Sequence, residues 1–232
     1  MNEEFKLSAR LRCAASMVRE GSFVADVGTD HAYLPIALAL EGKIRGAVAS
    51  DINAGPVERG RKNIEEHALT DRISVVMTDG LSGIEPYAPN DILILGMGGE
   101  LIARILECAP WTKDQSIRLC LQPMTHAEAL RSFLLDNGYS IIDEQLAEED
   151  ERIYQLISAQ YSGKSEHYSP AELLLGRINA QRCSDVFARL ARRTLDTLLK
   201  RARGKQSAGA DASGELSLIS EINSMISKEN TL

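Results

Sequence analysis

The sequence is poor in the features that build zinc sites, disulfide frameworks and membrane spans. Its 232 residues include only four cysteines, which are scattered along the chain and form no Cys-x-x-Cys pair. That spacing argues against bound metal and disulfides, and it predicts reduced thiols in a cytoplasmic protein. The first six residues lack a cationic start followed by an apolar core, and no apolar run approaches the length of a membrane span. We therefore expect neither an export signal nor a membrane partner.

A further absence concerns the loop after the first predicted strand, residues 23–27, which precedes a helical pattern over residues 32–40. A dinucleotide-binding loop would carry Gly-x-Gly-x-x-Gly, because a pyrophosphate must approach bare backbone. Here the three glycine positions hold Gly28, Asp30 and Tyr33. A carboxylate at this point disfavours NAD and FAD, whereas it suits a cationic ligand without phosphate, such as S-adenosylmethionine. An ordinary β-α turn with a capping aspartate is the alternative.

Acidic residues also end the next two predicted strands. The strand over residues 45–51 ends at Asp51, about 20 to 25 residues after the first loop, where a carboxylate typically binds the hydroxyl groups of a cofactor ribose. The strand over residues 72–78 precedes Asp79 and Gly80, which are candidates to bind the amine of an adenine, with a plain Asp-Gly turn as the alternative. The cofactor site is predicted to include the neighbouring residues Ile52, Asn53 and Leu81. Ile52 is a candidate to pack on the adenine, or else a core residue, and Asn53 is expected to cap the following helix.

A fourth predicted strand, residues 91–95, runs into the segment Gly96-Met97-Gly98-Gly99 and another helix. Three glycines in four positions let a planar group pass close to the main chain, so this segment is a candidate pocket for a substrate base. A flexible β-α turn is the alternative.

A fifth strand over residues 117–121 stops at Gln122-Pro123-Met124, and a helix runs from Thr125 to about Gly138. An antiparallel hairpin over residues 139–148 and 152–159 follows. Five β-α units and a terminal hairpin predict an α/β fold with a seven-stranded, doubly wound sheet. This is the Rossmann-like architecture of class I methyltransferases.

Beyond a boundary at residues 161–165, the pattern becomes helical and the charge changes sign. Residues 1–169 carry 16 Lys+Arg against 26 Asp+Glu, a net charge of −10, whereas residues 170–232 carry 10 against 7, a net charge of +3. Nine of these cations lie between Gly176 and Lys205, with two acids among them. Concentrated positive charge on an otherwise acidic protein predicts a phosphate-rich partner, and a solvated dimerisation helix is the alternative.

We therefore expect a cofactor-binding domain over residues 1–165 and a helical RNA-binding domain over residues 166–232. A small-residue loop over 204–214 and a second helix over 215–228 predict an antiparallel coiled-coil hairpin. The amino-terminal helix, residues 7–19, is predicted to cover the sheet, and its Arg10 is a candidate RNA contact. The RNA contacts predicted in the second domain are Arg177, Arg182, Arg189, Arg192, Arg193, Lys200 and Arg201.

Several segments together resemble the bacterial tRNA (adenine-N1)-methyltransferases that modify adenine 22 of tRNA. The matching signatures are Leu-Ser-Ala-Arg-Leu at 7–11, Ala-Asp-Val-Gly-Thr-Asp-His-Ala-Tyr-Leu-Pro at 25–35, Gly80 with its neighbours, Gly-Met-Gly-Gly at 96–99 and Leu-Gln-Pro at 121–123. The resemblance extends over nearly the whole chain, including the helical carboxyl-terminal part.

The resemblance implies methyl transfer from S-adenosylmethionine to N1 of adenine 22. It assigns the amino-acid end of the cofactor to Asp26, Gly28, Asp30 and His31, the ribose to Asp51 and the adenine amine to Asp79. It assigns the floor of the base pocket to Gly96, Met97, Gly98 and Gly99.

Adenine N1 carries an in-plane lone pair and attacks the methyl group without a base, so the enzyme must mainly supply proximity and an acceptor for the developing charge. Asp30 is our candidate acceptor, and a ligand of the cofactor ammonium is its alternative role. The base must be swung out of folded tRNA. In a chain with only 5% aromatic residues, Tyr33 is our candidate to stack on that base, and a core tyrosine is the alternative.

Two other functions fit parts of the sequence. A small-molecule methyltransferase would share the cofactor site but would not need the basic helix. A non-catalytic RNA-binding adaptor would share the basic helix but would not need the acids at the strand ends. We expect no DNA partner, and either a monomer or a weak homodimer.

Overall fold

The computed structural model describes residues 7–227 and separates into two units, Met1–Glu166 and His167–Leu232. The sequence analysis places the domain boundary one residue earlier. Two predicted features, the amino-terminal segment without an export signal and the end of the last helix at Lys228, lie outside the described residues. Within residues 7–227, no helix combines the length and the apolar character that a membrane span requires.

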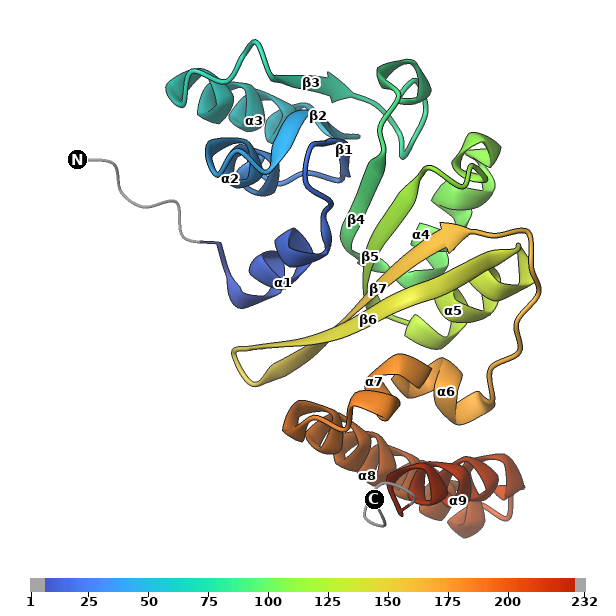
Figure 1. Cartoon of the computed structure of the whole chain (residues 1–232). Coiled ribbons are helices and arrows are strands. Elements are labelled where there is room, and N and C mark those ends of the chain that lie inside the picture. The colour runs from blue at the N-terminus through green and yellow to red at the C-terminus, as the bar shows by residue number, and fades with distance from the viewer. Residues whose placement is uncertain (1–6, 228–232) are drawn as a thin grey trace. The chain divides into compact units, whose positions relative to one another are not determined.

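A seven-stranded sheet organises the first unit (Figure 1). Its strands are β1 Ser22–Val27, β2 Ile44–Asp51, β3 Ile73–Met77, β4 Asp91–Gly98, β5 Arg118–Thr125, β6 Tyr139–Glu149 and β7 Arg152–Tyr161. β1 to β5 pair in parallel, β7 pairs antiparallel with β5 and β6, and the order is β3-β2-β1-β4-β5-β7-β6. The predicted sheet with its terminal hairpin is confirmed.

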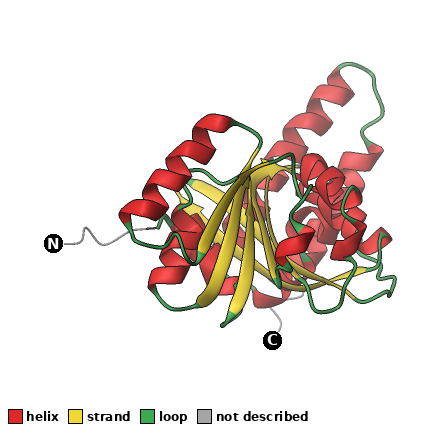
Figure 2. Ribbon diagram, turned by 90° about the horizontal axis from the view of Figure 1, so that it is seen from above, coloured by secondary structure: helices red, strands yellow, loops and turns green. Residues whose placement is uncertain are grey.

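Helices cover both faces of this sheet (Figure 2). They are α1 Ala9–Met17, α2 Tyr33–Leu40, α3 Ala54–Glu66, α4 Gly99–Glu107 and α5 Ala127–Asp136, with short 3-10 helices η1 Glu85–Tyr87 and η2 Pro110–Thr112. Because both faces are covered, the inner strands bury nearly continuous apolar runs. Val24 of β1, Ile36 of α2 and Leu93 of β4 are fully buried members of this core.

Two sequence-based boundaries in the first unit are wrong. β4 continues through Gly98, so Gly96 to Gly98 are strand residues and not a loop, and β5 continues through Thr125 instead of stopping at Pro123. The two strands stay paired, with Met97 opposite Pro123 and Gly98 opposite Thr125, across two register shifts. Pro123 cannot donate a ladder hydrogen bond, which is typical of such irregular pairing. The glycines thus lie where β4 and β5 continue to pair with each other beyond the point at which β4 stops pairing with β1.

The second unit contains α6 Pro170–Leu175, α7 Arg177–Arg182, α8 Asp185–Ser207 and α9 Ser213–Ser227. The continuous helix predicted before the small-residue loop is therefore wrong. It is interrupted at Gly176, with φ +91°, and at Cys183, with φ +48°, after which Ser184 caps α8 by accepting from Phe187 N–H. α8 and α9 pack against each other. A coiled-coil geometry for this pair stays a prediction.

Candidate active site

The loop between β1 and α2 has an unusual backbone conformation at the carboxyl edge of the sheet. Gly28 has φ +75°, and two residues with a side chain follow in the left-handed region, His31 at +61° and Ala32 at +56°. Gly28 N–H donates to Ser50 O on β2 at 2.8 Å, and Asn63 Nδ2 on α3 donates to His31 O at 2.8 Å. Strained backbone that is held by its neighbours is typical of functional sites.

Asp26, at the end of β1, is a buried carboxylate. Only 6% of the residue is exposed, and its Oδ2 accepts a hydrogen bond from Thr29 Oγ1 at 2.6 Å. Burial raises the pKa of Asp26 to about 6, and the Thr29 hydrogen bond offsets part of that rise. A carboxylate that has lost its hydration gains strongly from a nearby cation. This position therefore suits a positively charged group of a ligand.

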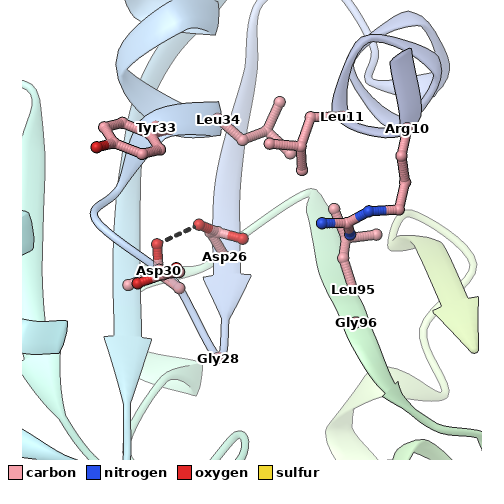
Figure 3. Close-up of a pocket in the computed structure, with 10 residues that line it drawn as sticks. Arg10, Leu11, Asp26, Gly28, Asp30, Tyr33, Leu34, Leu95 and Gly96 are labelled. Atoms are coloured by element: carbon pink, nitrogen blue, oxygen red, sulfur yellow. Dashed lines mark hydrogen bonds between the residues drawn. The ribbon is translucent and has the colours of Figure 1, made fainter. Parts of the chain in front are cut away.

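Asp26 faces a cavity of about 260 Å³ between this loop and β4 (Figure 3). The cavity is lined by Arg10, Leu11, Asp26, Gly28, Thr29, Asp30, Tyr33, Leu34, Leu95 and Gly96. Five residues that the sequence assigns to the cofactor or to catalysis thus share one cavity, namely Asp26, Gly28, Asp30, Tyr33 and Gly96.

Asp30 and Tyr33 lie on the exposed side of the cavity. The side chain of Asp30 is 76% exposed, and its Oδ1 lies 3.2 Å from His31 Nε2 and 3.7 Å from Arg59 Nη2. Tyr33 is 40% exposed, and its ring stacks on His31 with centroids 5.0 Å apart and an interplanar angle of 6°. The alternative of a core tyrosine is therefore wrong.

Arg10 and Gln122 form a polar link across the other side of the cavity. The fully buried Gln122 accepts two hydrogen bonds at Oε1, from Arg10 Nη1 at 3.0 Å and from Gly96 N–H at 3.1 Å. Its Nε2 donates to Pro123 O at 2.9 Å, which fixes the orientation of the amide. Gln122 therefore couples the α1 arginine to the first glycine of the predicted base pocket.

The acid at the end of β2 lies between the two neighbouring strand ends that carry Asp26 and Asp79. Asp51 Oδ1 accepts hydrogen bonds from Asn53 N–H at 2.7 Å and from Asn53 Nδ2 at 3.1 Å. Asn53 occupies the N-cap position of α3, but its side chain makes no capping hydrogen bond, so the predicted cap is wrong. Ile52 is 60% exposed, which excludes the core alternative and leaves its side chain accessible to a ligand.

A second cavity, of about 520 Å³, lies against the end of β3. Its lining comprises Asp79, Gly80, Leu81, Ser82, Leu101, Arg104, Ile105, Cys108 and Ala109. Of the residues predicted to bind the adenine, Asp79, Gly80 and Leu81 line this cavity and Ile52 does not. Of those predicted to bind the amino-acid end, Asp26, Gly28 and Asp30 line the first cavity and His31 does not. Asp51 lines neither cavity and lies on the strand between them.

The remaining residues of the predicted base pocket contact their neighbours closely. A Cβ atom on Gly28 would lie 2.1 Å from Met97 Cε, so the Met97 side chain lies directly against the β1–α2 loop. A Cβ atom on Gly98 would lie 3.4 Å from Thr125 Oγ1. Met97 and Gly98 thus occupy the space between the cofactor loop and the end of β5.

The predicted RNA contacts of the second unit fall into two groups. Arg177 is engaged inside the unit, because its Nε donates to Glu172 Oε1 at 2.8 Å and its guanidinium lies 3.9 Å from the centre of the Tyr168 ring. Arg189 is half-buried. The exposed residues are Arg182, Arg192, Arg193, Lys200 and Arg201.

Comparison with known proteins identifies the family. Residues 7–157 match the family described as methyltransferase domain. Over 175 residues the chain is 38% identical to the tRNA (adenine(22)-N(1))-methyltransferase of Bacillus subtilis, covering 75% of this chain and 74% of that protein. The chain belongs to the tRNA (adenine(22)-N1)-methyltransferase family.

Solved structures of this family extend the likeness to both units. The B. subtilis m1A22 tRNA methyltransferase TrmK superposes with a TM-score of 0.82 at 33% identity, covering 97% of each chain. Streptococcus pneumoniae Sp1610, solved in complex with S-adenosyl-L-methionine, gives 0.85 at 32% identity, covering 95% of this chain and 100% of that chain. Mycoplasma capricolum TrmK, in complex with S-adenosyl-homocysteine, gives 0.78 at 27% identity over 96% and 97%. The family resemblance predicted from the sequence is confirmed.

Two polar residues at this cavity were not predicted to belong to it, namely Arg10, which lines it, and Gln122, which accepts hydrogen bonds from Arg10 and from Gly96. Gln122 entered only as part of the signature Leu-Gln-Pro, and Arg10 was assigned to RNA although it lines the cavity. The two signatures that contain them were visible, but they lie 112 residues apart, and only the fold brings them together.

Proposed function

We propose that this protein transfers a methyl group from S-adenosylmethionine to N1 of adenine 22 in tRNA. The observation that carries the proposal is the 38% identity to the B. subtilis tRNA (adenine(22)-N(1))-methyltransferase over three quarters of the chain. A buried carboxylate that faces a cavity beside a glycine-rich strand end supports it independently.

The residues present fit the cofactor. When bound, S-adenosylmethionine supplies an electrophilic methyl group on a sulfonium and carries a second cation at its ammonium. Asp26 would face the ammonium, since its buried carboxylate has no cationic partner among the described residues and accepts from a neutral hydroxyl. Asp51 would bind the ribose hydroxyls, and Asp79 with Gly80 and Leu81 would bind the adenine. Ile52 would pack on the adenine face.

The chain's main catalytic contribution is to hold the two reactants together. Alignment of the reacting atoms near 3 Å contributes roughly 7 to 11 kcal/mol to such a reaction. Gly96 and Gly98 would let the adenine approach the main chain, and the exposed ring of Tyr33 would stack on it once it leaves the tRNA. Asp30, exposed at the same edge, would accept the positive charge that develops on the ring.

The RNA would be held by the basic helices of the second unit through its phosphates, which contributes affinity without reading sequence. Because Arg177 is bound to Glu172, the exposed cations of α8 carry this role best. A tRNA substrate supports a cytoplasmic location, and we expect the protein to act there as a monomer or a weak homodimer, without a DNA or membrane partner.

Product mapping tests this function. Full-length protein is incubated with labelled S-adenosylmethionine and unmodified tRNA, and the product nucleoside and its position are determined by mass spectrometry. We expect 1-methyladenosine at position 22 and no comparable transfer to free adenosine. Efficient methylation of free nucleosides would favour the small-molecule alternative, and no transfer to either substrate would favour the non-catalytic adaptor.

A further inference from the structure

The carboxyl edge of the sheet in the first unit is rich in negative charge. Four carboxylates lie at or just beyond the carboxyl ends of β1 to β3, namely those of Asp26, Asp30, Asp51 and Asp79. A base that is swung out of folded RNA rotates about its own backbone, so the phosphates that flank it must come close to the mouth of the site. Carboxylates repel phosphates, so an RNA substrate needs a cation at this edge.

Arg59 of α3 is directed toward this edge. α3 starts shortly after β2 ends, and the side chains of a helix lean toward its amino terminus. Accordingly, a Cβ atom on Gly55, one turn earlier, would lie 3.3 Å from Arg59 Nη1. Arg59 Nη2 lies 3.7 Å from Oδ1 of Asp30, which lines the first cavity. The guanidinium group therefore lies beside the mouth of this cavity.

The residues that follow Arg59 hold α3 against the β1–α2 loop. A Cβ atom on Gly60 would lie 3.5 Å from the Cβ atom of Ala32, and both residues are buried. Asn63 Nδ2 donates to His31 O at 2.8 Å. These contacts fix the backbone of α3 beside the loop, so the place of Arg59 does not depend on its own ion pair.

The ion pair between Arg59 and Asp30 is weak. The two side chains are 49% and 76% exposed, and their separation of 3.7 Å is longer than a hydrogen bond. A phosphate can replace Asp30, because it matches the planar fork of a guanidinium with two oxygens. Asp30 also lies 3.2 Å from His31 Nε2, and the His31 ring stacks on Tyr33. Arg59 thus lies two contacts away from the ring proposed to stack on the target adenine.

We propose that Arg59 binds a phosphate that flanks the target adenosine, so that the first unit holds the swung-out nucleotide by its base at Tyr33 and by its backbone at Arg59. This inference rests on the proposed function. It adds an RNA contact in the acidic first unit to the contacts proposed for the basic second unit. A cation beside four carboxylates offsets the local repulsion of the RNA backbone where the target base enters.

The test removes the charge from either partner. Two tRNA substrates, ligated from RNA halves, carry a neutral methylphosphonate on the 5′ or the 3′ side of adenosine 22, and a third carries it in the acceptor stem. Filter binding is measured on the full-length protein. We expect wild type to lose about three- to tenfold in affinity for one flanking substitution, between the value of an exposed ion pair and that of a charge-assisted hydrogen bond. Arg59→Gln should lose a similar factor on unmodified tRNA and nothing further on that modified tRNA.

Matched variants define the effect. Arg61→Gln removes an exposed cation two residues along α3, where Arg61 Nη2 donates to Val75 O at 3.5 Å, and it should respond to each methylphosphonate as the wild type does. Arg59→Lys keeps the charge but not the fork, so its affinity for unmodified tRNA should fall between those of the wild type and Arg59→Gln. Calorimetry with S-adenosylmethionine should give the same affinity for all three variants, which shows that they are folded.

Other outcomes overturn the inference. If each flanking methylphosphonate weakens Arg59→Gln as much as the wild type, Arg59 contacts neither phosphate, although the proposed function stands when the wild type forms 1-methyladenosine at position 22. If Arg59→Gln binds every tRNA as the wild type does but slows a single turnover at saturating tRNA, Arg59 only orients Asp30. If the wild type neither binds nor methylates tRNA, the inference fails together with the proposed function.

Discussion

At the scale of single residues, the site depends on one buried charge. The carboxylate of Asp26 has lost its hydration, and among residues 7–227 its side chain accepts a hydrogen bond only from Thr29, so its ionised form is disfavoured until a cation binds. A group in this state destabilises the free protein and stabilises the complex. The two effects can be measured separately.

Replacement of Asp26 by asparagine should stabilise the free protein and prevent donor binding. The asparagine keeps the size and the Thr29 contact but cannot ionise. A pKa raised from 3.8 to about 6 corresponds to roughly 2 to 3 kcal/mol at neutral pH. We expect denaturant unfolding at pH 7.5 to show a gain of that order for Asp26→Asn, with no further stabilisation by S-adenosylmethionine. A destabilised variant that still binds the donor would contradict this role.

The same carboxyl group predicts how stability and binding depend on pH. Between pH 3.8 and about 6 the folded chain holds a proton on Asp26 that the unfolded chain has lost, so this group lowers the free energy of unfolding as pH rises through that window. Donor binding should change in the opposite direction and weaken by up to about tenfold per unit below pH 6, because the protonated group no longer attracts the ammonium.

Calorimetric titrations from pH 5 to pH 7.5 check this dependence. The control ligand is 5′-methylthioadenosine, which lacks the amino-acid end and should bind with a constant affinity across the series. Equal pH dependence for the two ligands would assign the effect to another group.

The sequence was sufficient to single out Asp26, Gly28 and Asp79 as candidates, because each lies at or just after the end of an apolar strand and the signal is local. It was insufficient for Gln122, whose importance comes from two hydrogen bonds to distant segments. It placed Arg10 among the RNA contacts, because only the fold brings this residue into the cavity that holds Asp26.

At the scale of elements, the chain was predicted well where a single periodicity extends over a whole strand or helix. It was predicted poorly where pairing with a neighbouring strand extends an element, or where a single residue interrupts a helical pattern. β4 and β5 extend because they continue to pair beyond Leu95 and Leu121, which no local pattern reveals. The helical pattern expected beyond residues 161–165 continues across Gly176, so the sequence did not reveal the break at this glycine, which has a positive φ.

The junction of α4 and α5 offers a test of these element ends. A Cβ atom on Gly99 would lie 2.2 Å from the backbone oxygen of His126, and backbone cannot move aside as a flexible side chain can. Gly99→Ala should therefore cost about 1 to 3 kcal/mol of unfolding free energy. Gly98→Ala, whose Cβ would lie 3.4 Å from Thr125 Oγ1, is the neighbouring control and should cost less in the same denaturant titration. If the two variants lose the same unfolding free energy, the start of α4 is not in close contact with the start of α5.

At the scale of the whole molecule, the two units carry net charges of opposite sign. We therefore propose that they bind different substrates. The acidic first unit would bind the cationic donor, and the basic second unit would bind the tRNA. Phosphate contacts release counterions, so tRNA affinity should fall steeply with salt while donor affinity changes little.

A triple variant tests the role of the α8 cations and replaces Arg189, Arg192 and Arg193 by glutamine. It should bind tRNA at least about tenfold more weakly and with a smaller salt dependence, whereas its affinity for the donor should stay the same. The matched control replaces three cations of the first unit, Arg45, Lys113 and Lys164, which changes the net charge equally. Filter binding across a salt series separates the two variants. If the control weakens tRNA as much as the test variant, net charge and not the α8 surface holds the RNA.

We infer that the cavity between Asp26 and Gly96 receives the methyl donor beside the target base. A crystal structure of this protein with S-adenosyl-homocysteine is the decisive measurement. We expect the amino-acid end of the ligand at Asp26, its ribose at Asp51 and its adenine against Asp79 to Leu81. A ligand bound away from these strand ends, or one with its adenine in the Asp26 cavity, would contradict it.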